Sequence, residues 1–291
     1  MRLAAFTLFL SLSIAALSTH ANAQATFNGI ELDQTFNRHD SPAFGTHWFI
    51  DLEDNFSEPT RAADLSGSLV DTISMGFVLP AGDDLTNAGR WMPSTDYFVD
   101  SSNGGSISRQ AATSIEVTCI PWRITPELGD LYLIEMTSAI AEGELIRLGY
   151  FGNVNELGTD QGLTGDLAQL VLEVRRGEGA TANEYSWTID SPMLSSAVSD
   201  SFTLTPESDL RLQLGWNENT AEFDAWIESV EGENHLATGD LEGDLDVFGI
   251  GLELTGTGST VSNFIAAVPE PANISIVITA LISIAVFRRK R

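Results

Sequence analysis

Acidic residues recur at every second position of one short segment of the sequence, and these are Asp240, Glu242, Asp244 and Asp246. In an extended chain they share one face, and a turn at Gly243 would bring them together. Calcium takes six to eight oxygen ligands, many of them carboxylates. The leucines at the positions between the acids also fit a half-buried strand. The segment is therefore a candidate calcium site, and the strand interpretation stays open beside it.

Pairs of carboxylates two residues apart have the spacing that a glycoside hydrolase needs on one strand face. Two such pairs, Glu31 with Asp33 and Asp51 with Glu53, come nearest to a Glu-x-Asp-x-x-Glu pattern, but Phe36 and Phe56 stand in place of the last acid. In a chain with 41 acidic residues such pairs arise by coincidence, so both predict solvated strand faces. No G-x-S-x-G motif is present, and histidines such as His235 lack a partner nearby in the sequence. We nominate no catalytic residue and expect that the protein is not an enzyme.

Aromatic side chains are the remaining carriers of binding chemistry, because an exposed ring can stack against a sugar. Trp91 lies among loop residues in Ala88-Gly-Arg-Trp-Met-Pro93 and is the candidate for an exposed glycan-binding ring. A buried Trp91 is the alternative. Trp187, Trp216 and Trp226 alternate with polar neighbours, which predicts that they belong to the core.

Apolar and polar residues alternate with period two through most of the chain, and no amphipathic helix is evident. This pattern predicts an all-β fold, an antiparallel β-sandwich of the jelly-roll type. We expect one domain over residues 24–267. The predicted strands are Ser114–Ile124, Asp130–Thr137, Leu145–Phe151, Leu167–Arg175, Glu184–Ile189, Leu210–Trp216, Glu222–Val230, Asp246–Leu254 and Thr260–Ala267.

The sequence is strongly acidic, with a formal net charge of −27. Five of its 14 basic residues lie in the two terminal segments, so the predicted domain carries nine against 40 acidic residues, about −31, and has no lysine. Such a surface repels a polyanion, which excludes nucleic acid as a partner. Solubility in salty surroundings and binding of divalent cations both fit the charge. Cys119 is the single cysteine, which excludes an intramolecular disulfide, and it is predicted to be a small buried residue.

The N-terminus reads as a secretory signal peptide over residues 1–23. Met1-Arg2 supplies a positive charge, and Leu3–Leu17 supplies the apolar segment. Ala21 and Ala23 form the A-x-A cleavage site, so the exported chain is expected to begin at Gln24.

The C-terminus combines three elements: a Pro-Glu-Pro sequence after Val268, the uncharged apolar segment Ala272–Phe287, and Arg288-Arg-Lys-Arg291. As a helix the apolar segment reaches roughly 24 Å, somewhat short of the ~30 Å hydrocarbon core. The terminal basic cluster would stay on the cytoplasmic side. This predicts a marginal transmembrane helix at 272–287 that follows an accessible extended segment.

This arrangement over Val268–Arg291 resembles the PEP-CTERM sorting signal of bacterial surface proteins. The resemblance implies an exosortase-type membrane enzyme as partner, with Pro269, Glu270 and Pro271 as the recognition element. It also implies a transient inner-membrane anchor, removal of the tail, and delivery to the cell surface or extracellular matrix. An ordinary C-terminal membrane anchor is the alternative.

A second resemblance covers Asp130–Val230, which is similar to the concanavalin A-like lectin and laminin-G sandwiches. It is carried by Leu145-Ile-Arg-Leu-Gly-Tyr-Phe-Gly152, Leu170-Val-Leu-Glu-Val-Arg175 and Leu210-Arg-Leu-Gln-Leu-Gly-Trp216. It implies the jelly-roll fold and, more loosely, binding of extracellular polysaccharide. The expected function is that of an exported, non-catalytic surface or matrix protein. A surface glycoside hydrolase, or another carbohydrate-active enzyme of this fold, is the alternative.

Overall fold

The structure is a computed structural model. It describes residues 25–27, 30–33, 38–39, 41–45, 48–57, 65, 70, 72–74, 77–78, 89–92, 96–101, 104–110, 118–124, 131–152, 167–204 and 209–269. The predicted signal peptide, with Ala21 and Ala23, and the tail from Glu270 onward lie outside this part. Among the described residues, no helix is long and apolar enough to cross a membrane. The predicted helix at 272–287 is not among the residues described.

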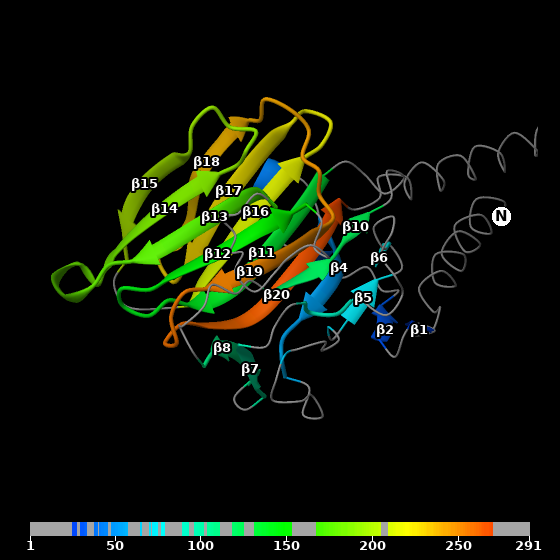
Figure 1. Ribbon diagram of the computed structural model, residues 1–291, viewed down its shortest axis with the longest axis horizontal. Helices are drawn as coiled ribbons and strands as arrows, with labels where there is room; N and C mark the ends of the chain where they lie inside the picture. The colour runs from blue at the N-terminus through cyan, green and yellow to red at the C-terminus, as the bar shows by residue number, and fades with distance from the viewer. Residues whose placement is uncertain are drawn as a thin grey trace, which may run out of the picture.

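Two sheets lie face to face (Figure 1). The twelve-stranded sheet has the main order β1 (Ala25–Phe27), β2 (Ile30–Asp33), β5 (Thr72–Ser74), β4 (Trp48–Asp54), β20 (Thr260–Pro269), β11 (Leu131–Ala139), β16 (Leu210–Asn217), β17 (Glu222–Ser229) and β18 (Gly232–Asp240). Three further strands join it: β3 (Arg38–His39), β7 (Tyr97–Asp100) and β8 (Ser106–Arg109).

The six-stranded sheet has the order β15 (Val198–Thr203), β14 (Glu184–Asp190), β13 (Ala168–Arg176), β12 (Leu145–Phe151), β19 (Gly249–Leu254) and β9 (Thr118–Pro121). A small separate ladder joins β6 (Phe77–Val78) to β10 (Arg123–Ile124). Every strand pairing in the described part is antiparallel except the one between β2 and β5. The prediction of an all-β, antiparallel β-sandwich is therefore confirmed.

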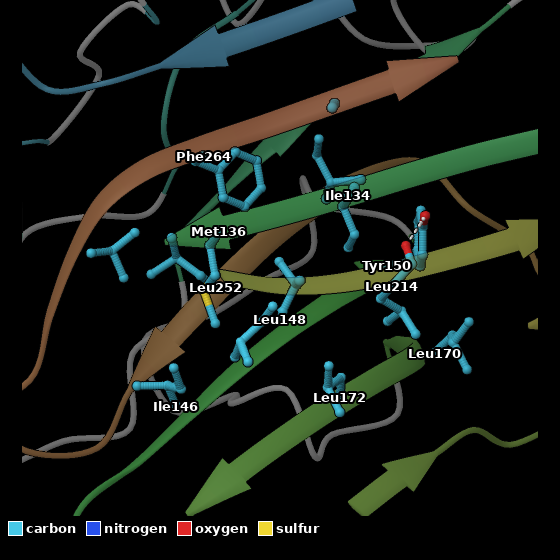
Figure 2. Close-up of a cluster of buried hydrophobic side chains, with 14 of the residues drawn as sticks. Ile134, Met136, Ile146, Leu148, Tyr150, Leu170, Leu172, Leu214, Leu252 and Phe264 are labelled. Atoms are coloured by element: carbon cyan, nitrogen blue, oxygen red, sulfur yellow. Dashed lines mark hydrogen bonds between the residues drawn. The ribbon is translucent and has the colours of Figure 1, made fainter. Parts of the chain in front are cut away.

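The main core fills the space between the two sheets, and period-two alternation places its residues there. In β12, Ile146, Leu148 and Tyr150 face inward and have no exposed surface. Ile134 and Met136 of β11 approach them from the other sheet, as Figure 2 shows. Burial of large apolar side chains at this density supplies most of the favourable free energy of folding.

The Tyr150 hydroxyl is a buried polar group among these apolar side chains, and it has a hydrogen-bond partner. Its hydroxyl donates to the backbone oxygen of Leu214 at 2.9 Å. Burial raises the pKa of the Tyr150 hydroxyl well above its ordinary value, and the neighbouring Tyr132 adds to the shift. The hydroxyl therefore stays neutral in the folded protein at physiological pH.

A bulge in β4 turns an acidic side chain into the protein. The register between β4 and β20 shifts, so that Ala267 pairs with Ile50 and Ala266 pairs with Leu52, and Asp51 is the extra residue. Asp51 is 1% exposed, and the indole N–H of Trp122 donates to its carboxylate at 2.8 Å. The prediction of a solvated face for Asp51 is wrong, because the bulge breaks the alternation.

The strand predictions miss the short strands β1, β3, β5, β6, β7 and β8, they miss two edge strands, and they misplace some strand ends. β15 and β18 were not predicted, and both are outermost strands with mainly exposed side chains. Each pairs along one side only and buries few apolar residues, so the apolar alternation that marks the inner strands is weak there. β20 runs two residues further than predicted, to Pro269, whereas β19 begins only at Gly249.

Candidate functional site

Side chains of β11, β16, β17 and β18 form a polar row on the outer face of the twelve-stranded sheet, away from the main core. The pairing register aligns Glu135, Gln213, Trp226 and His235 across these four strands. In β11, β16 and β17 the neighbours of these residues along the strand, such as Ile134, belong to the main core. We call this row, together with the flanking Arg211, Asp224 and Glu228, the outer-face site.

An arginine joins two carboxylates at the centre of the site. Arg211 Nε lies 2.7 Å from Glu135 Oε1, and Arg211 Nη1 binds Glu228 Oε2. Gln213 Nε2 donates to the other oxygen of Glu135 at 3.1 Å. Burial lowers the pKa of the Arg211 guanidinium, but Glu135 and Glu228 outweigh this effect and the pKa is raised above its ordinary value. Arg211 is therefore a fixed cation held between two acids.

A histidine stacked on a tryptophan forms the accessible end of the site. The ring centroids of Trp226 and His235 are 4.6 Å apart, and the ring planes are tilted by 36°. His235 Nε2 lies 2.7 Å from Asp224 Oδ1, which fixes the orientation of the imidazole. The side chain of His235 is 40% exposed and that of Asp224 is 11% exposed. A planar aromatic surface thus meets solvent beside a fixed carboxylate.

The segment Ser41–Gly45 lies across the inner end of the site. The Ser41 hydroxyl donates to Gln213 Oε1 at 3.1 Å, and the Phe44 N–H donates to Asp224 Oδ2 at 2.9 Å. A Cβ added at Gly215 would lie 2.8 Å from the Phe44 ring, so only glycine allows this approach. Phe44 itself has φ of 52°, which is unusual for a bulky residue. The segment thus covers the site beside Gln213 and Asp224.

A second apolar cluster supports the site from the same outer face. Trp48, Leu133 and Ile265 are buried there, and Trp226 packs against their cluster. The indole N–H groups of Trp48 and Trp226 are buried and have no hydrogen-bond partner in the described part of the chain. Asn263 Oδ1 is a buried acceptor that also has no hydrogen-bond partner among the described residues. Unpaired buried polar atoms are rare in folded proteins.

The prediction of an exposed, glycan-binding Trp91 is wrong. Trp91 has no exposed surface, and its indole N–H donates to Asp54 Oδ2 at 2.7 Å. Its ring packs edge-on against Phe264 at a centroid distance of 5.1 Å. The loop residues around it are polar or small, but the ring itself fills the core.

The four acids of the candidate calcium site are not brought together. Within the described residues, which include the whole of Asp240–Asp246, no group of three or more His, Cys, Asp or Glu side chains is placed to hold a metal ion. Leu241 and Leu245 are each 6% exposed, whereas the acids between and beside them are exposed. Because the two leucines are buried in the core, the acidic side chains of the segment are left on its exposed side and do not converge.

The recognition residues of the predicted sorting signal lie at the edge of what is described. Pro269 is the last residue of β20 and pairs with Trp48 of β4. Glu270 and Pro271 lie outside the described residues.

Sequence reasoning missed the outer-face site and treated its residues one by one. Trp226 was predicted as core and His235 as isolated. The alternation of Asp224, Trp226 and Glu228 along one strand was the available signal, because it places all three on one face. The stack with His235 depends on the pairing of β17 with β18, a strand that the sequence pattern did not reveal.

No protein-family model matches the chain, and no curated protein matches it. Solved structures that resemble it include a Lotus tetragonolobus seed lectin, at 9% identity and a TM-score of 0.41, covering 60% of this chain and 92% of that chain. An endo-1,3-beta-glucanase from Streptomyces sioyaensis is similar at 14% identity and a TM-score of 0.37, covering 80% of this chain and all of that chain. The galectin LEC-6 of Caenorhabditis elegans is similar at 10% identity and a TM-score of 0.31, covering 51% and 88%. A likeness this loose indicates neither a ligand nor a reaction.

Proposed function

We propose that this chain is an exported surface or extracellular-matrix protein whose β-sandwich binds glycan and does not cleave it. The observation that carries the glycan-binding part is the half-exposed stack of Trp226 and His235 beside Asp224. Ligand sites combine aromatic surface with a few fixed polar groups. An aromatic ring accepts the apolar face of a pyranose, while a fixed carboxylate accepts hydrogen bonds from its hydroxyls.

The site supports binding better than catalysis. Glycoside hydrolysis needs one carboxylic acid that can give up a proton and a second carboxylate that attacks or activates water. Glu135 and Glu228 both bind the Arg211 guanidinium, so neither is arranged as a proton donor. Asp224 is engaged by His235 and by the Phe44 amide. These contacts favour a non-enzymatic role over the hydrolase alternative.

Export and sorting form the second part of the proposal, and they rest on the sequence. A signal peptide would send the chain across the inner membrane, and an exosortase-type enzyme would recognise Pro269, Glu270 and Pro271. The position of β20 is compatible with this, because the strand ends at Pro269 and the proposed signal begins where the sheet stops.

A glycan array probed with the purified full-length chain tests the binding proposal. Trp226→Ala is expected to abolish the array signal, because it removes the stacking surface. Val198→Ala, an exposed apolar residue of β15 in the other sheet, is the control and should leave the signal unchanged. An array without any binding would refute the proposal, and release of shorter sugars from a bound glycan would favour the hydrolase.

Cell fractionation and intact-mass analysis of the protein from its native host test the sorting proposal. The expected mature form lacks both termini and is found in the surface or matrix fraction. A surface form that still contains Ala272–Arg291 would contradict it.

A further inference from the structure

Acidic side chains lie directly opposite one another on both sides of the Trp226–His235 stack. Glu222 pairs with Asp240 and Glu228 pairs with Glu233 in the register of β17 and β18. Opposed side chains in an antiparallel pair have Cβ atoms only about 5 Å apart, and like charges there are destabilising. Arg211 offsets the charge of Glu228, whereas within the described residues the pair of Glu222 and Asp240 has no ion-pair partner.

The two acidic pairs bracket the proposed binding surface along the strand. Glu222 and Glu228 are six positions apart in β17, which is roughly 20 Å of extended chain. Trp226 lies between them and faces the same side. A sugar ring stacked on Trp226 therefore places its chain neighbours near one acidic pair or the other.

The balance of charge on this face is negative even after the internal ion pairs are counted. Arg211 is shared by Glu135 and Glu228, and the nearby histidine is engaged by Asp224. The pair of Glu222 and Asp240 has only a hydroxyl contact in the described structure, from Thr220 to Glu222 at 2.6 Å. A cation near these carboxylates would relieve their repulsion.

The unpaired polar atoms of the same face give an independent indication of a ligand. Among the described residues Asn263 Oδ1 is a buried acceptor without a donor, and Asn263 lies in the same cross-strand row as Thr137, Arg211 and Glu228. In the part of the chain that the structure describes, Trp48, which has no exposed surface, and Trp226 each hold an indole donor without an acceptor. The Trp226 donor belongs to the stack itself, and a hydroxyl oxygen of a ligand seated on that ring is the kind of acceptor it lacks.

We propose that the outer-face site takes a polysaccharide with free amino groups, whose ammonium groups lie against the two acidic pairs while one sugar ring stacks on Trp226. This inference rests on the proposed glycan-binding function and names the class of glycan. A uronic acid polymer is rejected by the same charges, and a neutral polymer binds through stacking alone.

Two hexasaccharides with the same sugar backbone and different amino groups provide the test: a glucosamine hexamer with free amines and the same hexamer fully N-acetylated. Binding to the full-length chain is measured by calorimetry at about 150 mM salt, where charges more than roughly 8 Å apart are screened. The amine form is expected to bind about tenfold more tightly than the acetylated form, since two close charge pairs supply about that factor.

Paired variants separate a local effect from the general acidity of the protein. Glu222→Gln with Asp240→Asn is expected to weaken the amine hexamer several-fold and to leave the acetylated hexamer unchanged. The control is Glu184→Gln with Asp190→Asn, which removes the same charge from exposed positions on β14 of the other sheet. The control should bind both hexamers as the unchanged protein does.

Each other outcome has a definite meaning. Equal binding of the two hexamers overturns the charge inference but leaves the glycan-binding proposal intact, whereas binding of neither hexamer counts against both. An equal loss in the control variant would show diffuse attraction and overturn the inference. So would an oligolysine of the same charge that binds as tightly and is insensitive to Trp226→Ala, because the partner would then be a basic peptide.

Discussion

Replacing Arg211 by methionine tests whether the outer-face site is held together by its central ion pairs. The change keeps a long side chain but leaves Glu135 without its guanidinium partner. The Glu135 side chain is 3% exposed, and removing one partner of a buried pair costs about 3–5 kcal/mol because the remaining charge is not solvated. The Glu228 side chain is 38% exposed, so that half of the bridge adds less than about 1 kcal/mol. The expected loss is about 3–5 kcal/mol, a large part of the stability of an ordinary domain.

Urea unfolding, followed by tryptophan fluorescence at neutral pH, measures this loss. Glu228→Gln breaks only the exposed half of the bridge and should cost no more than about 1 kcal/mol. The double variant Arg211→Met with Glu135→Leu removes the buried charge as well and is expected to regain most of the lost stability. A single variant that costs under about 1 kcal/mol, or a double variant no more stable than the single one, would refute this reasoning.

Two further variants probe the core. Tyr150→Phe removes the hydrogen bond to Leu214 and should lower the free energy of unfolding by about 1 kcal/mol at neutral pH. Because the folded pKa of Tyr150 is raised, its contribution is complete below the unfolded value of about 10 and is lost as the pH rises through the folded pKa. The unfolding free energy of the parent should therefore fall more steeply above about pH 10 than that of the variant. Urea unfolding of both proteins at several pH values measures this, and an equal pH dependence of the two unfolding free energies would contradict it. Gly251→Ala places a Cβ 2.3 Å from the Thr118 oxygen and should cost about 1–3 kcal/mol by forcing β9 away from β19, which urea unfolding measures. An unchanged midpoint would argue against that close approach.

The sandwich was predictable from the sequence where long strands carry an uninterrupted apolar face into the main core. Leu145–Phe151 was predicted with the bounds that β12 has, because its large apolar residues alternate without interruption. β15 and β18 were not predicted because an edge strand pairs along one side only and exposes both faces over much of its length. Their pairing is fixed by the neighbouring strand rather than by their own apolar pattern.

The site was much less predictable, since it depends on register and on tertiary contacts. Trp91 has the local surroundings of an exposed residue, yet Asp54 accepts its N–H inside the protein. Asp51 faces inward only because β4 has a bulge, and no local pattern marks that extra residue. Trp226 meets His235 across a pairing whose register itself shifts between Ala225 and Trp226. One residue more or less in that shift would place the histidine on the other face.

The position of β20 limits where a processing enzyme can cut if the sorting proposal holds. β20 lies in the interior of its sheet, with β4 on one side and β11 on the other. Val268 is 3% exposed and belongs to the main core, and its backbone pairs with Phe49. Cleavage before Val268 would therefore remove core contacts and backbone hydrogen bonds together, whereas cleavage beyond Pro269 removes none that the described structure contains. The folded sandwich thus confines productive cleavage to the segment after β20. A chain attached to the cell surface through its new C-terminus would then be anchored by β20, an interior strand paired with β4 and β11.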